Sequence, residues 1–127
     1  MADKECFETE KAPCMGGPYS QAVIHNGMIY LTAQGPLNPE TNKAQLGTIE
    51  EETMLSMDNI RTILEEAGSS LEKILQVNVY LLRIKDYSRF NEVYRGYFQK
   101  DFPARSCIEA AKLPFGFSVQ LSVVAYI

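Results

Sequence analysis

An arginine inside an apolar segment constrains the fold of this chain more than any other feature of its sequence. Residues 103–108 read Pro-Ala-Arg-Ser-Cys-Ile, which is typical of a buried strand apart from Arg105. A guanidinium stays protonated, and burying it without a partner costs several kcal/mol. The fold must therefore bring Arg105 to a carboxylate of the chain or to a pocket that binds an anion. The segment by itself favours the internal ion pair.

The composition is typical of one globular domain. The chain has 127 residues, 46% hydrophobic and 22% charged, so residues 1–127 can form a core without disulfide bonds or metal ions. No apolar run approaches the roughly 20 residues that span a bilayer. The amino-terminal residues are charged and mixed in sign, unlike a signal peptide. We expect a single cytoplasmic domain that does not enter membranes.

The cysteines, the histidine and the net charge argue against several classes of site. Cys6, Cys14 and Cys107 lie far apart, and an odd number of cysteines suits a reducing compartment better than a disulfide framework. The one histidine, His25, cannot build a His-rich metal centre and is expected in a surface turn. We expect no metal. A net charge of -4 with scattered lysines and arginines does not favour nucleic acid as a partner.

The first part of the chain reads as three short strands. Residues 5–10 form an edge strand in this prediction. Two further runs, 21–24 and 28–33, flank the dipeptide Asn26-Gly27, which is a strong signal for a two-residue hairpin loop.

A helix follows the loop over residues 36–47. Thr48 and Glu51 have the spacing of a capping box, which marks the start of the helix. Apolar residues then recur at helical spacing until Gly68, which is expected to end it.

The second half reads as strand, helix, strand, strand. Residues 71–84 alternate, so that one face carries Leu75, Val77, Val79 and Leu81. Asp86 can cap a second helix with an apolar stripe of Phe90, Val93, Tyr94, Tyr97 and Phe98. Strands over 104–111 and 117–127 complete the chain, and in the last one Phe117, Val119, Leu121, Val123, Ala125 and Ile127 share a face.

This order of elements predicts an α+β domain of two layers, a mixed sheet with both helices on one face. Strict alternation places a second set of residues on the opposite face: Tyr80, Leu82, Arg105, Cys107, Gln120, Val124 and Tyr126. Such a face is too apolar for water and too polar for a core, which is typical of a subunit interface. We therefore expect a closed homo-oligomer with the Arg105 pocket at or near a subunit boundary.

Four motifs together resemble the RidA/YjgF (L-PSP) family of small imine deaminases. They are Gly-Pro-Tyr-Ser-Gln-Ala at 17–22, Ile-Tyr-Leu-Thr-Ala-Gln-Gly-Pro-Leu at 29–37, Asn-Glu-Val-Tyr at 91–94, and Phe-Pro-Ala-Arg-Ser-Cys at 102–107 with Leu-Pro at 113–114. They follow the family order and spacing over residues 12–127.

The resemblance implies a chorismate-mutase-like domain assembled as a homotrimer, with pockets between neighbouring subunits. It implies hydrolysis of reactive enamines and imines, such as 2-aminoacrylate, 2-iminopropanoate and 2-iminobutanoate, to 2-oxo acids and ammonia without a cofactor. Arg105 would grip the substrate carboxylate in a bidentate fork, which is the anion that its burial requires. Cys107 would act through its backbone carbonyl, steering water or the imine nitrogen.

Five further residues belong to the implied pocket. Tyr19, Thr32 and Ala33 would line one side, and Tyr87 and Asn91 would lie nearer the entrance. Packing or capping would explain Tyr19, Tyr87 and Asn91 equally well, and Thr32 could be an ordinary strand residue.

Three positions depart from the usual family pattern. Thr32 replaces serine, Ala33 replaces glycine, and Gln120 stands where many active members have glutamate. An amide can orient water but cannot take up a proton. Because of Gln120, one alternative function is a non-catalytic trimer that binds a small carboxylate. Endoribonuclease or translation-inhibitor activity is another alternative, against which the acidic charge and the lack of aromatic residues between basic ones argue.

Overall fold

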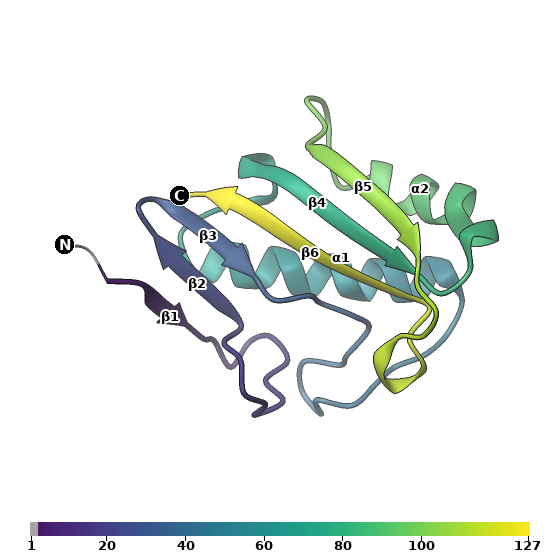
Figure 1. Ribbon diagram of the computed structural model, residues 1–127, viewed down its shortest axis with the longest axis horizontal. Helices are drawn as coiled ribbons and strands as arrows, with labels where there is room; N and C mark the ends of the chain where they lie inside the picture. The colour runs from purple at the N-terminus through teal and green to yellow at the C-terminus, as the bar shows by residue number, and fades with distance from the viewer. Residues whose placement is uncertain (1–2) are drawn as a thin grey trace.

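The computed structural model describes residues 3–127, so Met1 and Ala2 of the charged amino-terminal segment lie outside it. The described residues form, in order, β1 (Glu5–Phe7), β2 (Ala22–His25), β3 (Met28–Leu31), α1 (Ile49–Glu66), β4 (Ile74–Leu81), α2 (Tyr87–Arg95), β5 (Ala104–Glu109) and β6 (Val119–Tyr126) (Figure 1). This is the predicted order of elements.

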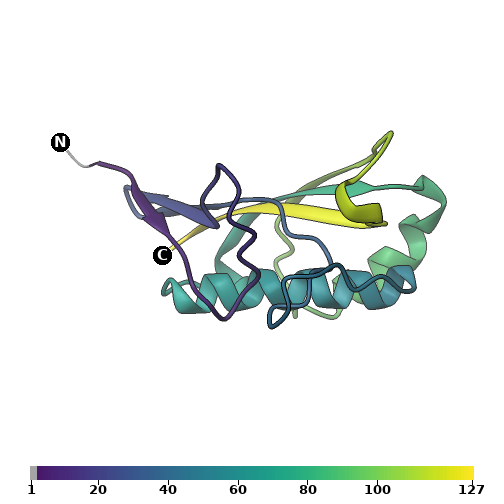
Figure 2. The ribbon, with the colours of Figure 1, turned by 90° about the horizontal axis from the view of Figure 1, so that it is seen from below.

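The strands form one mixed sheet in the order β1-β2-β3-β6-β4-β5. The pair β4–β5 is parallel, and the other pairs are antiparallel. Both helices lie on the same side of the sheet (Figure 2). The predicted α+β domain of two layers, with helices on one face, is confirmed.

The Asn26-Gly27 hairpin is confirmed. His25 pairs with Met28, which leaves Asn26 and Gly27 as a loop of two residues. Their φ angles of 51° and 76° are both positive, as a type I′ turn requires. His25 flanks the turn and is half-buried.

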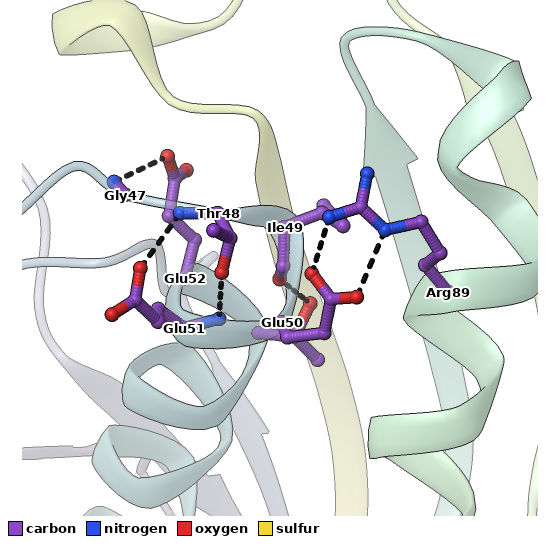
Figure 3. Close-up of polar contacts among 8 residues, drawn as sticks. Gly47, Thr48, Ile49, Glu50, Glu51, Glu52 and Arg89 are labelled. Atoms are coloured by element: carbon purple, nitrogen blue, oxygen red, sulfur yellow. Dashed lines mark hydrogen bonds and ion pairs between the residues drawn. The ribbon is translucent and has the colours of Figure 1, made fainter.

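The amino terminus of α1 carries the predicted capping box (Figure 3). The Thr48 amide donates to the Glu51 carboxylate at 2.9 Å, and the Thr48 hydroxyl accepts from the Glu51 amide at 3.1 Å. Next to it, Arg89 of α2 donates two hydrogen bonds to Glu50, at 2.8 and 2.7 Å. These bonds lower the pKa of Glu50 and join the two helices at the surface.

The buried carboxylate of Glu52 connects α1 to the segment immediately before β6. The residue is 2% exposed, and its oxygens accept from the Gly47 amide at 3.2 Å and the Ser118 amide at 2.8 Å. Sequence reasoning missed this contact, because acidic residues in the first turn of a helix ordinarily face water and complement the helix dipole.

Strict alternation misplaced Leu75 of β4 and Ile127 after β6, both of which were predicted on the apolar face. The β4–β6 register shifts between Ile74 and Gln76, so Ile74 is buried and Leu75 is 47% exposed. Ile127 lies beyond the end of β6 and is also exposed. Both predictions failed because alternation holds only while the ladder is continuous.

The second helix is shorter than its predicted apolar stripe. Asp86 occupies the cap position, but its side chain makes no capping hydrogen bond. Because α2 ends at Arg95, Tyr97 and Phe98 follow the helix, and both still pack against the core.

We predict that Glu52→Gln lowers the free energy of unfolding by about 1–3 kcal/mol, because the new amide group would face one of the two backbone N–H donors and leave it unsatisfied. Urea unfolding at fixed protein concentration measures the change. Glu65→Gln, at an exposed position of the same helix, is the control and should change stability by less than about 0.5 kcal/mol. Equal stability of the two variants would contradict a structural role for Glu52.

Candidate functional site

Arg105 lies on the helix side of the sheet. In the parallel pair β4–β5, Arg105 is opposite Val77 and Cys107 is opposite Val79, and both valines are buried. Residues in register share a face, so Arg105 and Cys107 face the helices. Gln120 pairs with Tyr80 and faces the other way.

The prediction that Arg105 and Cys107 share a face with Gln120 is therefore wrong. In β5 neither alternating set is clearly apolar, so the period of two could not tell which face is buried. The aromatic side chains of α2 decide the matter, since they form a surface on which a guanidinium can pack.

Three aromatic rings surround the Arg105 guanidinium. Its central carbon lies 4.9 Å from the ring centre of Tyr94 and 5.5 Å from those of Tyr87 and Phe90. Each such contact contributes about 0.5–2 kcal/mol. An Nη of Arg105 also donates to the Tyr87 hydroxyl at 3.1 Å.

Arg105 takes part in none of the salt bridges between residues 3 and 127. The internal ion pair that the segment by itself favoured is thus wrong. Aromatic faces stabilise the cation without neutralising it, so the positive charge remains available to an anion from outside the chain.

A cavity of about 210 Å³ opens beside Arg105. Its lining consists of Asn91, Tyr94, Arg95, Phe102, Pro103 and Arg105. The side-chain oxygen of Asn91 and the hydroxyl of Tyr94 are buried and have no hydrogen-bond partner among the described residues. The volume suits a small ligand, and these polar atoms could bind one.

Cys107 follows Arg105 on the same face of β5 and is half-buried. Burial raises the pKa of its thiol, and the positive charge of Arg105 partly opposes this shift. The thiol is therefore protonated near neutral pH and is a poor nucleophile.

A second cavity, of about 530 Å³, contains the other predicted residues: Tyr19, Thr32, Ala33 and Gln120 all line it. The segment after β3 is held beside β6 by two backbone hydrogen bonds: the Gln34 N–H donates to the Leu121 carbonyl at 2.7 Å, and the Gln34 carbonyl accepts from the Leu121 N–H at 2.9 Å. The side-chain oxygen of Gln120 is buried and has no partner among the described residues.

Gln21 fixes the loop that carries Tyr19. Its buried side chain donates to the carbonyls of Thr9 at 3.0 Å and Pro13 at 2.8 Å, and it accepts from the Thr9 amide. Tyr19 itself is 53% exposed at the edge of the cavity. Sequence reasoning assigned no role to Gln21, although it stands in the first motif.

The predicted site residues thus form two groups within one chain. The first group lies on the helix side of the sheet and contains Arg105, Tyr87 and Asn91. Cys107 lies on the same side, two residues after Arg105 in β5. The second cavity shares no lining residue with the first. One chain does not bring Arg105 and Gln120 to the same ligand.

Sequence reasoning also missed Phe90 and Tyr94, which it assigned only to the core. Tyr87, Phe90, Asn91 and Tyr94 follow each other at helical spacing, and such residues lie on one face of a helix. The sequence did contain a signal for their role: the motif residue Asn91 lies on the same helix face as the aromatic stripe, which indicates that this face belongs to the site.

The described residues contain neither a cluster of metal ligands nor a membrane-spanning helix. Between residues 3 and 127, no three histidine, cysteine or acidic side chains are grouped so as to hold a metal ion. In the same part of the chain, neither helix has the length and apolar character needed to cross a membrane.

Comparison with known proteins identifies the family. The model of the family described as Endoribonuclease L-PSP matches residues 9–127. A RutC family protein of Pyrococcus abyssi is 42% identical over 123 residues, which are 97% of each chain. The 2-iminobutanoate/2-iminopropanoate deaminase of Bos taurus is 37% identical over 122 residues, covering 96% of this chain and 89% of the relative.

The fold agrees with these matches. The crystal structure of YyfA from Yersinia pestis, of the conserved Rid protein family, is 37% identical and superimposes with a TM-score of 0.95, covering 98% of this chain and 100% of that one. The chain therefore belongs to the RidA/YjgF, or endoribonuclease L-PSP, family, which includes imine deaminases.

Proposed function

We propose that this protein hydrolyses small 2-imino acids, such as 2-iminopropanoate and 2-iminobutanoate and the enamine 2-aminoacrylate, to 2-oxo acids and ammonia. The observation that carries the proposal is Arg105, a cation packed on three aromatic rings beside a small cavity and without a carboxylate partner among the described residues. The imine deaminase activity of the bovine relative supports it.

In the proposed reaction, Arg105 holds the substrate carboxylate in a bidentate fork. An enamine first takes up a proton at C3 to become the imine. Water then adds to C2 of the C=N bond, and the resulting carbinolamine loses ammonia as the C=O bond forms. The Cys107 backbone carbonyl orients water or the imine nitrogen, since the protonated thiol is unsuited to attack. The reaction requires no cofactor.

We also propose that the functional unit is a homotrimer with shared sites. The group containing Arg105, Tyr87 and Asn91 would face Tyr19, Thr32, Ala33 and Gln120 of a neighbouring subunit. The division into two cavities supports this arrangement. So does the sheet face that the helices leave uncovered (Figure 2). The strand register places Tyr30, Ile108 and Tyr126 on this face, and all three side chains are exposed.

A binding protein without catalysis is the second candidate, and Gln120 is the observation that favours it. The amide can orient water but cannot accept its proton. Endoribonuclease activity is not part of this proposal, because the net charge of -4 opposes binding to a phosphate backbone.

The three free cysteines support a reducing compartment, and we propose that the protein is located in the cytoplasm.

Arg105→Lys should remove most of the acceleration of 2-iminopropanoate hydrolysis, because an ammonium cannot form the planar fork. A pyridoxal-phosphate dehydratase that releases the imine, with detection of the 2-oxo acid, gives the rate. Arg83→Lys, at an exposed position before α2, is the matched control and should retain the wild-type rate. Full activity of Arg105→Lys would show that carboxylate binding does not depend on this residue.

Gln120→Glu should increase the hydrolysis rate if a carboxylate at this position takes up a proton from water. A general base contributes about 10²- to 10⁴-fold, so the effect would exceed experimental error. The variant should also gain a pH dependence in which the rate rises as the carboxylate ionises. An unchanged rate with a flat pH profile would indicate that Gln120 only orients water.

The wild-type protein should have three times the chain mass in light scattering at micromolar concentration. Ile108→Lys places a charge on the uncovered sheet face and should shift the protein toward monomers. Met54→Lys is the control, since Met54 is 50% exposed on α1, in the helix layer. A wild-type monomer that is fully active would exclude the shared site.

A further inference from the structure

The hydroxyl of Tyr94 is a buried polar group that the fold does not explain. Tyr94 lies on α2 and is 4% exposed, and it lines the cavity of about 210 Å³ beside Arg105. Its hydroxyl has no hydrogen-bond partner among the described residues. Buried polar groups in native proteins are almost always satisfied, so this exception indicates a partner that is not part of the chain.

Packing accounts for the ring of Tyr94 but not for its hydroxyl. The ring centre lies 5.4 Å from that of Phe90 and 5.0 Å from that of Phe98, and it carries the closest cation–π contact of Arg105. A phenylalanine would make all of these contacts. The hydroxyl therefore needs a separate explanation.

The neighbouring tyrosines show what a satisfied hydroxyl looks like in this fold. Tyr97 donates to the Asp58 carboxylate at 2.9 Å and lies 3.1 Å from the Met54 carbonyl oxygen. Tyr87 accepts from Arg105 at 3.1 Å. Tyr94 is close to the same guanidinium yet makes neither kind of bond.

The chemistry of the surroundings restricts the missing partner. Burial raises the pKa of Tyr94 to about 12, against an opposing effect of the Arg105 charge, so the hydroxyl keeps its proton at neutral pH. Arg105 offers only donors. A group that satisfies both side chains must therefore accept hydrogen bonds and carry negative charge, as a carboxylate does.

We propose that Tyr94 is a substrate-binding residue whose hydroxyl donates to the carboxylate that Arg105 holds. This inference rests on the proposed function and deepens it, because it adds a neutral donor to the cationic fork. The carboxylate would be bound by a guanidinium that three rings orient and by a hydroxyl from one of those rings. Small 2-oxo and 2-imino acids share this group and are the ligand class.

Tyr94→Phe tests the proposal, because it removes the hydroxyl and keeps the ring beneath the guanidinium. Calorimetry with pyruvate should show about 10- to 100-fold weaker binding, the range expected for one hydrogen bond to a charged group. In the imine assay KM should rise more than kcat falls, since the bond exists before and during the reaction. The ligand-free variant should unfold at the wild-type temperature or above it.

Tyr97→Phe is the matched control and should give the opposite pattern. Its hydroxyl is already bonded to Asp58, so its loss should lower the unfolding temperature and leave pyruvate affinity unchanged. Arg105→Lys serves as the reference for loss of the carboxylate site.

The outcomes separate the two claims. If Tyr94→Phe binds pyruvate like the wild type while Arg105→Lys does not, the Tyr94 proposal is overturned and the proposed function stands. A lower unfolding temperature of ligand-free Tyr94→Phe would also overturn it, because the hydroxyl would then have a structural partner. If the wild type neither binds pyruvate nor hydrolyses imines, both claims fail.

Discussion

The contact between Arg105 and the aromatic face of α2 determines how this molecule can present a positive charge. A carboxylate partner would neutralise the guanidinium, and a ligand would then have to displace it. Aromatic rings attract the cation through their quadrupole and leave its hydrogen-bond donors largely free. The same contact packs the edge strand β5 against the helix layer, so the stability of this region and the anion binding that we propose for it would have one origin.

The sequence predicted faces correctly where one alternating set of a strand is clearly apolar. In β6, Val119, Leu121 and Val123 are all buried as expected, and the Asn-Gly hairpin has the expected geometry. In β5 the residues alternate without such contrast, and only the packing of α2 decides which set is covered. Tertiary contact thus supplied what local periodicity lacked. The register shift in β4 could not be predicted either, because it arises from the pairing with β6 and not from the local pattern of residues.

The motifs identified candidate site residues but not their grouping in space. Strand β4 lies between β5 and β6, and Arg105 and Gln120 pair with its residues Val77 and Tyr80. These two positions point to opposite faces because they are an odd number of residues apart. Side chains on opposite faces of one sheet cannot hold the same small molecule, so a site that uses both must draw them from different chains.

The distribution of unsatisfied polar groups supports this view. Within the described residues, four buried side-chain polar atoms lack a partner, in His25, Asn91, Tyr94 and Gln120. Three of the four residues line the two candidate cavities. Desolvated groups without partners destabilise the free protein, and a ligand or neighbouring subunit that satisfies them recovers that free energy on binding. Their concentration at the two candidate cavities is what a shared binding site would produce, whereas unsatisfied groups unrelated to binding would be distributed through the core.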